Sequence, residues 1–412
     1  MRWSVWCVAV VAALAVLGCK MRAQTGPEVA TPAFVILDPG QLARGKARAA
    51  AGESTKAMSS LVTGCNWAME QPPRTVVFGE KETPSSDPHD YVSLQTYLWP
   101  NPQTPDGQPW IVKDGEVFPG AATPDKQALD FVCTQARLLA LGYAATGNQA
   151  YADRAAKLLR VFFLDPATRM NPNMTHAQMA TGRNTGSPSG IIDSRMLLRI
   201  VDVPALLAGS KALTPAETAG LRQWCAQYLD WLLTSRNGIQ EGQARNNHGT
   251  WYDAQVVGLA LFAGRADTAR TQLARATARL YAQIDVEGLQ PEEIRRTKSL
   301  NYHLFNLEGW FTLALMAEKA GVDLWTLTTA SGRSLRQALD ALRPFLRGDK
   351  PWPHQQIREL HAGDLRQAAF LLRLGGLKYG DDSYEKDLDH VLGSLAPGLE
   401  LNLTFPPSSG QR

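Results

Sequence analysis

A succession of short amphipathic stretches from about residue 125 onward constrains the fold of this chain most. Apolar residues between Leu129 and Ala140 recur at i, i+3, i+4 and i+7, the spacing of one helix face. Similar stretches follow near 150–163, 191–209, 215–234, 250–263, 266–284, 305–320, 332–346, 363–375 and 383–394. Strand-like alternation is scarce, and no Gly-rich phosphate loop follows a strand. The pattern predicts one all-α domain over 24–412, built of helical hairpins stacked in a ring or superhelix.

The start of the chain differs from this pattern. After an apolar start at 34–37, an Ala-rich stretch at about 40–68 is typical of helix. Residues 72–124 are rich in proline and aromatic side chains and show few helical periods. Long irregular segments inside compact domains are usually functional, so we expect this Pro-rich segment to lie near a cleft.

Composition and charge exclude several classes of protein. The chain has 412 residues, of which 44% are hydrophobic and 20% charged, so it is neither a disulfide-stapled miniprotein nor mostly disordered. The formal charge is +3, from 42 basic and 39 acidic residues. Residues 1–23 hold three of the basic residues and no acid, which leaves 39 against 39. Bulk charge therefore predicts no nucleic-acid partner, and a polyanion would need a local cluster of cations.

The first 23 residues have the pattern of an export signal. Arg2 precedes an apolar run at 5–17 that is too short to span a bilayer comfortably. Two cleavage sites compete: one before Cys19, which would become a lipid anchor, although Leu17 fits a lipobox poorly, and one after Ala23. We therefore expect a periplasmic or secreted protein, or an outer-membrane lipoprotein that touches the membrane only through Cys19.

Export would place Cys65, Cys133 and Cys225 in an oxidising compartment. Their separations of 68 and 92 residues do not have the spacing of metal ligands. We expect buried apolar thiols; one disulfide with one free cysteine is the alternative.

Polar groups gather at two places inside apolar surroundings. The first is 245–253, where Asn247 offers an amide N–H and His248 offers an acid, a base or a neutral donor. Asn246 or Asn247 could instead cap the helix that follows.

The second polar stretch is 295–303. Arg295 and Tyr302 are seven residues apart and would share a face if both lay on one helix. Arg295, Arg296 and Lys298 place three cations within four residues, as a neutral protein would need to hold a carboxylate-rich polymer. The alternative for Arg296 and Lys298 is a solvated basic turn.

These motifs together resemble the alginate lyase domain family of helical-toroid polysaccharide lyases. The matching segments are 246–253, 288–302 and 305–308, preceded in consistent order by 87–91, 97–100, 114–116, 170–173 and 191–195. The resemblance implies an incomplete (α/α) toroid of about six to seven helical hairpins. One departure is Asn301, where many relatives are expected to have histidine before the tyrosine.

The resemblance also implies a reaction and roles for residues. The family cleaves uronate polymers by β-elimination, with Asn247 and Arg295 as carboxylate neutralisers and His248 and Tyr302 as the acid–base pair. Nearby arginines are expected to lower the pKa of Tyr302 toward the working range. No metal or cofactor is needed for this scheme, and we expect a monomer.

Further residues are expected to bind the polymer. In the Pro-rich segment Tyr91, Tyr97, Trp99 and Trp110 could form a lid or stacking wall over sugar rings, although these aromatics could merely pin the loop. We expect His89, Tyr91, Tyr97 and Trp99 to bind substrate. The remaining substrate-binding candidates are Gln178, Arg195, Asn246 and Arg296.

Alginate, as polymannuronate, is the leading substrate, and another uronate polymer such as glucuronan is the alternative. A lipid-anchored glycan-binding protein without catalysis is less consistent with the four catalytic candidates. A glycoside hydrolase would need two paired acids, and Glu292, Glu293 and Asp253 do not pair convincingly.

Overall fold

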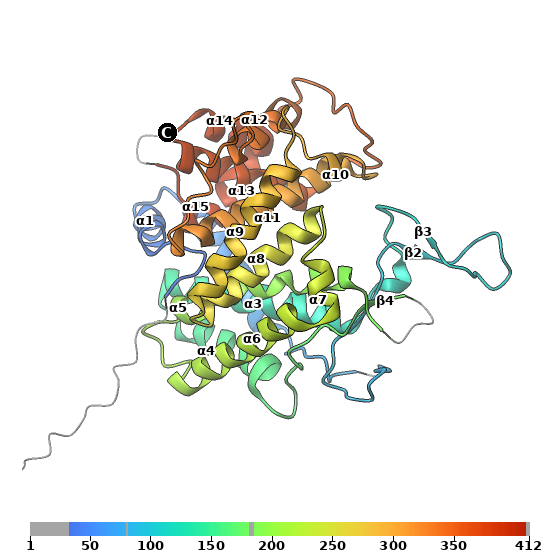
Figure 1. Cartoon of the computed structure of the whole chain (residues 1–412). Coiled ribbons are helices and arrows are strands. Elements are labelled where there is room, and N and C mark those ends of the chain that lie inside the picture. Colours follow the sequence, from blue (N-terminus) through green and yellow to red (C-terminus); the bar gives the residue numbers. More distant parts are fainter. Residues whose placement is uncertain (1–32, 80, 181–184, 409–412) are drawn as a thin grey trace, which may run out of the picture. The chain divides into compact units, whose positions relative to one another are not determined.

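A computed structural model describes residues 33–79, 81–180 and 185–408. The proposed signal peptide and Cys19 lie outside these residues. The described chain is mostly helical, which confirms the all-α expectation, and it carries two small two-stranded sheets (Figure 1). None of the helices in the described ranges is both long enough and apolar enough to span a membrane.

The α-helices follow the periodic stretches of the sequence closely. They are α1 (Pro39–Ala50), α2 (Thr55–Glu70), α3 (Pro124–Thr146), α4 (Gln149–Leu159), α5 (Val203–Leu206), α6 (Pro215–Thr234), α7 (Arg236–Glu241), α8 (Asn247–Phe262), α9 (Ala266–Gln283), α10 (Pro291–Ile294), α11 (Ser299–Lys319), α12 (Leu335–Leu346), α13 (Ala362–Tyr379), α14 (Ser383–Leu392) and α15 (Leu401–Thr404). Short 3-10 or π turns complete them at η1 (Pro119–Ala121), η2 (Arg160–Leu164), η3 (Pro188–Arg199) and η4 (Gly393–Gly398). Thr214 and Glu217 form a capping box at the start of α6, in which each side chain accepts a backbone N–H of the other residue.

Helices α8 and α11 lie at the centre of the core and pack against each other (Figure 1). Both are apolar on nearly every face and buried at most positions, as expected for helices surrounded by other elements. The buried Gln283 at the end of α9 accepts hydrogen bonds from Thr250 of α8 (2.9 Å) and from Asn306 (3.1 Å) and Trp310 (2.8 Å) of α11. This amide joins the first turn of α8 to the middle of α11.

The expectation of an α-helix at 191–209 is wrong. The chain forms the 3-10 helix η3 up to Arg199 and then the short α5, which contains Pro204. Between them Asp202 uses its carboxylate to accept the backbone N–H groups of Val35 (2.5 Å) and Leu37 (2.7 Å). Proline and these carboxylate bonds interrupt the regular helix, while apolar periodicity persists because the segment is still buried.

The Pro-rich segment is irregular, as expected. It contains the strands β1 (Val92–Leu94), β2 (Leu98–Trp99) and β3 (Ile111–Val112); β2 pairs antiparallel with β3, and β1 pairs parallel with β4 (His176–Met179). After β3 the chain turns through Gly115 at φ +80°, where a Cβ atom would lie only 2.4 Å from the hydroxyl oxygen of Thr297. Only glycine permits this approach, which docks the segment onto the turn before α11.

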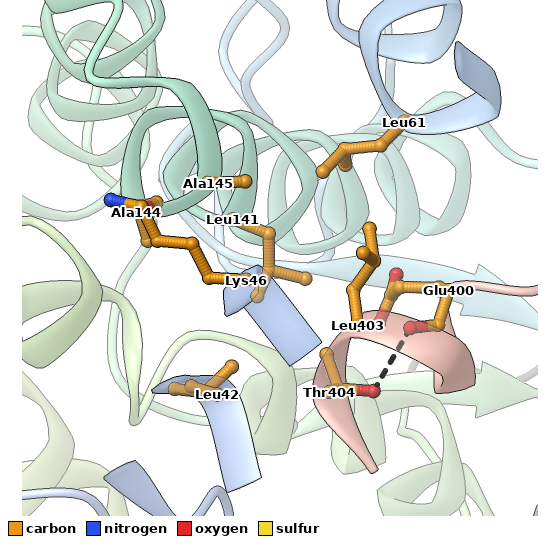
Figure 2. A pocket seen from close by; sticks show the side chains of 9 residues that line it. All are labelled: Leu42, Lys46, Leu61, Leu141, Ala144, Ala145, Glu400, Leu403 and Thr404. Carbon is orange, nitrogen blue, oxygen red and sulfur yellow. Dashed lines mark hydrogen bonds between the residues drawn. The ribbon is translucent and has the colours of Figure 1, made fainter. Parts of the chain in front are cut away.

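Cys65, Cys133 and Cys225 are buried free thiols, which confirms the first expectation over the disulfide alternative. Burial raises the pKa of Cys65 to about 12, so this thiol is held protonated and unreactive. A small apolar pocket of about 40 Å³ lies among α1, α2, α3 and α15, lined by Leu42, Leu61, Leu141 and Leu403 (Figure 2).

Candidate active site

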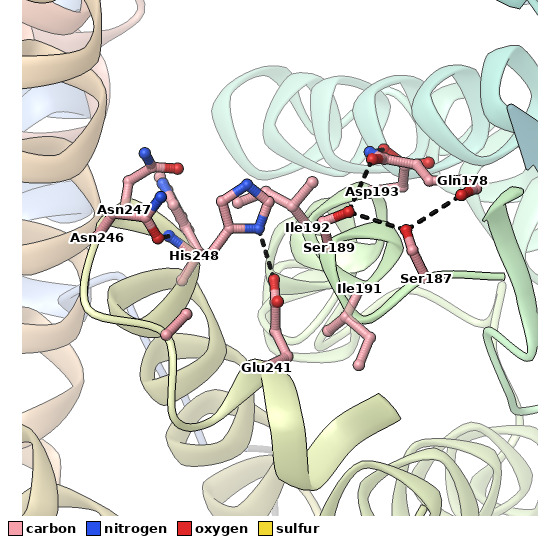
Figure 3. A network of polar contacts seen from close by, with 12 residues as sticks. Gln178, Ser187, Ser189, Ile191, Ile192, Asp193, Glu241, Asn246, Asn247 and His248 are labelled. Atoms are coloured by element: carbon pink, nitrogen blue, oxygen red, sulfur yellow. Dashed lines mark hydrogen bonds and ion pairs between the residues drawn. The ribbon is translucent and has the colours of Figure 1, made fainter. Parts of the chain in front are cut away.

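His248 stands at the N-terminus of α8, and a buried acid fixes its ring. Asn246 is the N-cap residue, because its side-chain oxygen accepts the backbone N–H of His248 at 3.2 Å. The ring nitrogen Nδ1 lies 2.6 Å from Oε1 of Glu241, a residue of α7 that is only 4% exposed. A carboxylate can only accept, so Nδ1 carries the proton and Nε2 is left as the acceptor. Figure 3 shows the ring extending from the helix end with Nδ1 toward Glu241.

Asn247 is held by a second buried acid. Both oxygens of Glu293 accept from it, one from the backbone N–H (2.6 Å) and one from the side-chain amide (2.8 Å). Burial raises the pKa of Glu293 to about 7, although the hydrogen bonds from Asn247 and the charges of Arg296 and His248 act to lower it. The sequence showed Glu293 only as an unpaired acid, since its distance of 46 residues from Asn247 hides the contact.

Tyr302 lies in the first turn of α11 under a guanidinium group. Arg296 donates to its hydroxyl at 2.7 Å and stacks with Cζ 3.7 Å from the ring centre, and the Tyr97 hydroxyl lies 2.6 Å away. The expected lowering of the Tyr302 pKa is wrong for the free protein. Burial and the neighbouring Tyr97 raise this pKa and outweigh the opposing effect of Arg296.

Asp114 of the Pro-rich segment fixes Arg296 in place. The carboxylate accepts from Nε of Arg296 at 3.0 Å, from Nη2 at 2.5 Å and from the backbone N–H of Thr297 at 2.9 Å. Burial acts to raise the pKa of Asp114, but these hydrogen bonds lower it below its usual value. Lys298 adds a second cation, with Nζ 5.5 Å from the Tyr97 ring and 6.0 Å from the Tyr302 ring.

Arg295 does not share a face with Tyr302, and that expectation is wrong. Helix α10 ends at Ile294 and α11 begins at Ser299, so the seven-residue spacing crosses a break between helices. The Arg295 side chain is 70% exposed and pairs with Glu292 at 2.9 Å. Its neighbour Arg296 occupies the place beside Tyr302 that the spacing argument gave to Arg295.

Tyr91 is buried and cannot stack on a sugar ring, which corrects that expectation. It is 1% exposed, and its hydroxyl donates to Asp193 at 3.1 Å. Asp193 also accepts from Ser93 (2.8 Å), Lys126 (2.9 Å) and Gln178 (3.1 Å). Tyr91 therefore supports a polar cluster, which Figure 3 shows across from His248.

Gln178 belongs to this cluster and is held in a strained backbone conformation. Its φ is +47°, which is unusual for a residue with a side chain, and its amide reaches Asp193. Its backbone carbonyl accepts from Ser187 at 3.0 Å. Such strain often marks functional sites, consistent with the expected binding role.

The other binding candidates lie around this centre. Half-buried His89 points Nδ1 at the carbonyl of Arg169 (2.6 Å), and Trp99 donates to the carbonyl of Glu116 (2.9 Å). Arg195 donates to the carbonyl of Ile192 at 3.0 Å and stacks over Phe305 at 5.3 Å. The structure thus joins Tyr97 directly to Tyr302, while His89, Trp99 and Arg195 are engaged by other partners.

Asn301, the departure from the family pattern, is 7% exposed and accepts from Gln356 at 2.5 Å. Throughout the described ranges no group of three His, Cys, Asp or Glu residues is arranged to hold a metal ion.

Residues 78–352 match the alginate lyase family. The chain belongs to the alginate lyase family. An alginate lyase from Bacteroides ovatus is 32% identical, with a TM-score of 0.85, over 90% of this chain and 98% of that one. No protein with a curated description matches.

More distant structures share the fold of this alginate lyase family member. Alginate lyase A1-III from Sphingomonas species A1 is 14% identical, with a TM-score of 0.50, over 86% of this chain and 97% of that one. A variant of A1-III complexed with a tetrasaccharide is 13% identical, with a TM-score of 0.53 and the same coverage. At this identity the likeness concerns the fold alone, an α/α toroid. The resemblance seen in the sequence is confirmed: the chain is a polysaccharide lyase of this family.

Proposed function

We propose that the protein cleaves a 1,4-linked uronate polymer by β-elimination, with polymannuronate as the leading substrate. The observation that carries this proposal is that a neighbour prepares each of two proton-transfer groups. His248 has Nδ1 against Glu241, which leaves Nε2 as an acceptor, and Tyr302 has its hydroxyl held by Arg296. The base removes the C5 proton, the C4–O4 bond breaks, a C4–C5 double bond forms, and O4 takes a proton.

The site can stabilise the charge that develops during this reaction. Removal of the C5 proton builds negative charge on the adjacent carboxylate, and preorganised donors aimed at such charge are a large catalytic contribution. We assign this role to Asn247 and to Arg296, in place of Arg295. Asn247 is held by Glu293 and Arg296 by Asp114, so neither needs to reorganise as the charge develops.

The roles of the acid–base pair depend on the polymer. In guluronate the C5 proton and O4 lie on opposite sides, so His248 would take the proton while Tyr302 protonates O4. In mannuronate and glucuronate both lie on one side, and Tyr302 would serve both steps. Because the raised pKa keeps Tyr302 protonated in the free protein, the same-side route requires it first to pass its own proton on.

Ultraviolet absorbance near 230 nm tests this proposal, because elimination creates a conjugated double bond that hydrolysis does not create. The full mature chain is incubated separately with polymannuronate, polyguluronate and glucuronan. We expect absorbance to rise with polymannuronate. A rise with glucuronan alone would replace the substrate, and silence with all three would contradict elimination of these polymers.

We also propose that residues 1–23 are removed on export, that 24–412 form one monomeric domain, and that six to seven helical hairpins make up its toroid. Intact mass spectrometry of the mature protein distinguishes the two cleavage sites. A lipid-modified Cys19 at the N-terminus supports anchoring, whereas a chain that begins after Ala23 supports a free protein.

A further inference from the structure

A second cavity, called the inner cavity below, lies one helical turn further along α8 and α11 than the candidate catalytic groups. Its volume is about 540 Å³, within the range of roughly 300–1,000 Å³ usual for small-molecule sites. Trp251 and Phe305 line it, and each follows a catalytic candidate, His248 or Tyr302, by three positions on the same helix. Because three positions make about one helical turn, the cavity begins one turn below those groups.

Four arginines and four acidic residues line this inner cavity. The arginines are Arg137, Arg195, Arg199 and Arg366, and the acids are Asp202, Glu308, Asp364 and Glu400. The formal balance is therefore neutral, and the partners of each group decide what the cavity can bind.

Most of the acids are already engaged. Glu400 pairs with Arg137 at 2.7 Å, and Asp202 accepts backbone N–H groups from the 35–37 segment. Asp364 caps α13 and pairs with His361 at 2.6 Å. Glu308 accepts from Gln367 at 2.7 Å and, like Asp202, has no cation within 4 Å among the described residues.

Three arginines of the cavity, Arg195, Arg199 and Arg366, have no carboxylate within 4 Å in the described part of the chain. Arg199 has surface open to the cavity, and the protein around it lowers its pKa. Glu308 lies close enough to Arg195 and Arg199 to offset part of their charge. The cavity therefore offers unpaired guanidinium groups, which match a planar carboxylate.

The remaining walls suit a sugar ring. Phe370 is only partly buried and offers an apolar wall, whereas the ring of Phe305 packs against Trp251 and Arg195. Glu308, Thr312 and Gln367 supply polar atoms for hydroxyl groups. Phosphate or sulfate would use the arginines but not the aromatic walls.

We propose that the inner cavity is a binding site for a uronate sugar, held through its carboxylate by Arg195 and Arg199 beneath the catalytic groups. The choice of a uronate rests on the proposed function. Arg195, which the sequence analysis names as a substrate-binding candidate, would then bind a carboxylate in this cavity and not beside His248 and Tyr302.

Calorimetric titration of the full mature protein with free glucuronate tests this site, with glucose as the uncharged comparison. We expect glucuronate to bind more tightly than glucose. Arg199→Gln should weaken glucuronate binding roughly ten- to a hundredfold, because a charge-assisted contact is lost. Glu308→Gln should tighten it several-fold, because the opposing charge is removed. Arg270→Gln, at an exposed arginine paired only with Asp267, should leave it unchanged.

The opposite signs of the Arg199 and Glu308 variants separate binding in the cavity from loss of folding, since a misfolded variant cannot bind more tightly. Equal affinity of wild type and Arg199→Gln, or equal affinity for glucuronate and glucose, overturns the proposal. The absorbance assay is independent. If the protein eliminates but glucuronate binding does not depend on Arg199, only the proposal of an inner site is wrong. If binding depends on Arg199 but no polymer is cleaved, only the proposed reaction is wrong.

Discussion

The two sides of the candidate active site are prepared by opposite charges. Carboxylates back the α8 side, where Glu241 lies 2.6 Å from His248 and Glu293 holds Asn247. Cations back the α11 side, where Arg296 donates to Tyr302 and Lys298 lies near its ring. A carboxylate behind an imidazole favours its protonated form, whereas a guanidinium beside a phenol favours the phenolate.

This difference assigns the resting proton of each group. His248 has one nitrogen already donating to Glu241, so its other nitrogen can accept a proton and the resulting cation is stabilised. Tyr302 remains protonated at rest because burial outweighs Arg296, so Arg296 exerts its influence when the proton leaves. The contrast teaches that the resting protein has one group ready to accept a proton, His248, and one that still holds its proton, Tyr302. The same-side route proposed for polymannuronate therefore begins with loss of the Tyr302 proton, and Arg296 stabilises the phenolate that results.

Tyr302→Phe should have the largest effect, because it removes the only hydroxyl that Arg296 contacts in the described structure. Loss of a general acid–base group costs about 10²–10⁴-fold in rate, and we expect kcat near the upper end of that loss. Polymer binding should change little, as measured by affinity electrophoresis in polymannuronate. Tyr97→Phe is the matched control and should cost far less; equal losses in both variants would make the pair, rather than Tyr302, the acid.

The helix start on the α8 side could be predicted from the sequence. Asn246, Asn247 and His248 are consecutive there, so one local motif contains both the observed cap, Asn246, and the proposed reactive group, His248. Their partners Glu241 and Glu293 escaped prediction, because contacts that join α7, α8 and α10 depend on how helices pack.

The α11 side shows where periodicity misleads. A continuous helix over 295–303 would place Arg295 on the same face as Tyr302. The chain instead breaks between α10 and α11, so Arg296 rather than Arg295 contacts Tyr302. The break is stabilised from far away in sequence, by Asp114 at Thr297 and by the bridge between Lys298 and Gln356. The expectation that Tyr91 stacks on a sugar ring is wrong for a similar reason, because its hydrogen-bond partner Asp193 is 102 residues away in the sequence.

Arg296→Ala and Arg295→Ala test which of the two arginines stabilises charge on the α11 side of the site. Removing Arg296 should lower kcat/KM about 10²-fold, because a preorganised donor to developing charge is lost. Removing Arg295 should change it less than about threefold, since an exposed pair such as Arg295–Glu292 contributes little. Steady-state kinetics at 230 nm measure both. A larger loss in Arg295→Ala would return the carboxylate contact to that residue.

Glu241→Gln should have a smaller effect, and it separates positioning from mere stability. The amide can still accept from Nδ1 of His248 but no longer stabilises the imidazolium, so we expect about a tenfold lower kcat. KM should change little, because the substitution acts through the ring of His248. An unchanged kcat with a lower melting temperature would show that Glu241 only stabilises the fold.

Glu293→Gln should affect the pH dependence of stability more than the rate. Burial raises the pKa of Glu293 to about 7 from the ordinary 4.5, so the folded protein retains a proton that the unfolded chain releases. The free energy of unfolding should therefore be unaffected below pH 4.5, should fall by up to about 3 kcal/mol as pH rises to 7, and should then level off.

The variant lacks this titration, whereas every other group titrates in both proteins. Urea unfolding at pH 4.5 and pH 7.5 should thus show wild type losing stability relative to Glu293→Gln as pH rises. Parallel curves would mean that Glu293 ionises normally and that the Asn247 amide is held by a full carboxylate at every working pH. In that case Glu293 would add a full negative charge to the α8 side, opposite in sign to Arg296 and Lys298 on the α11 side.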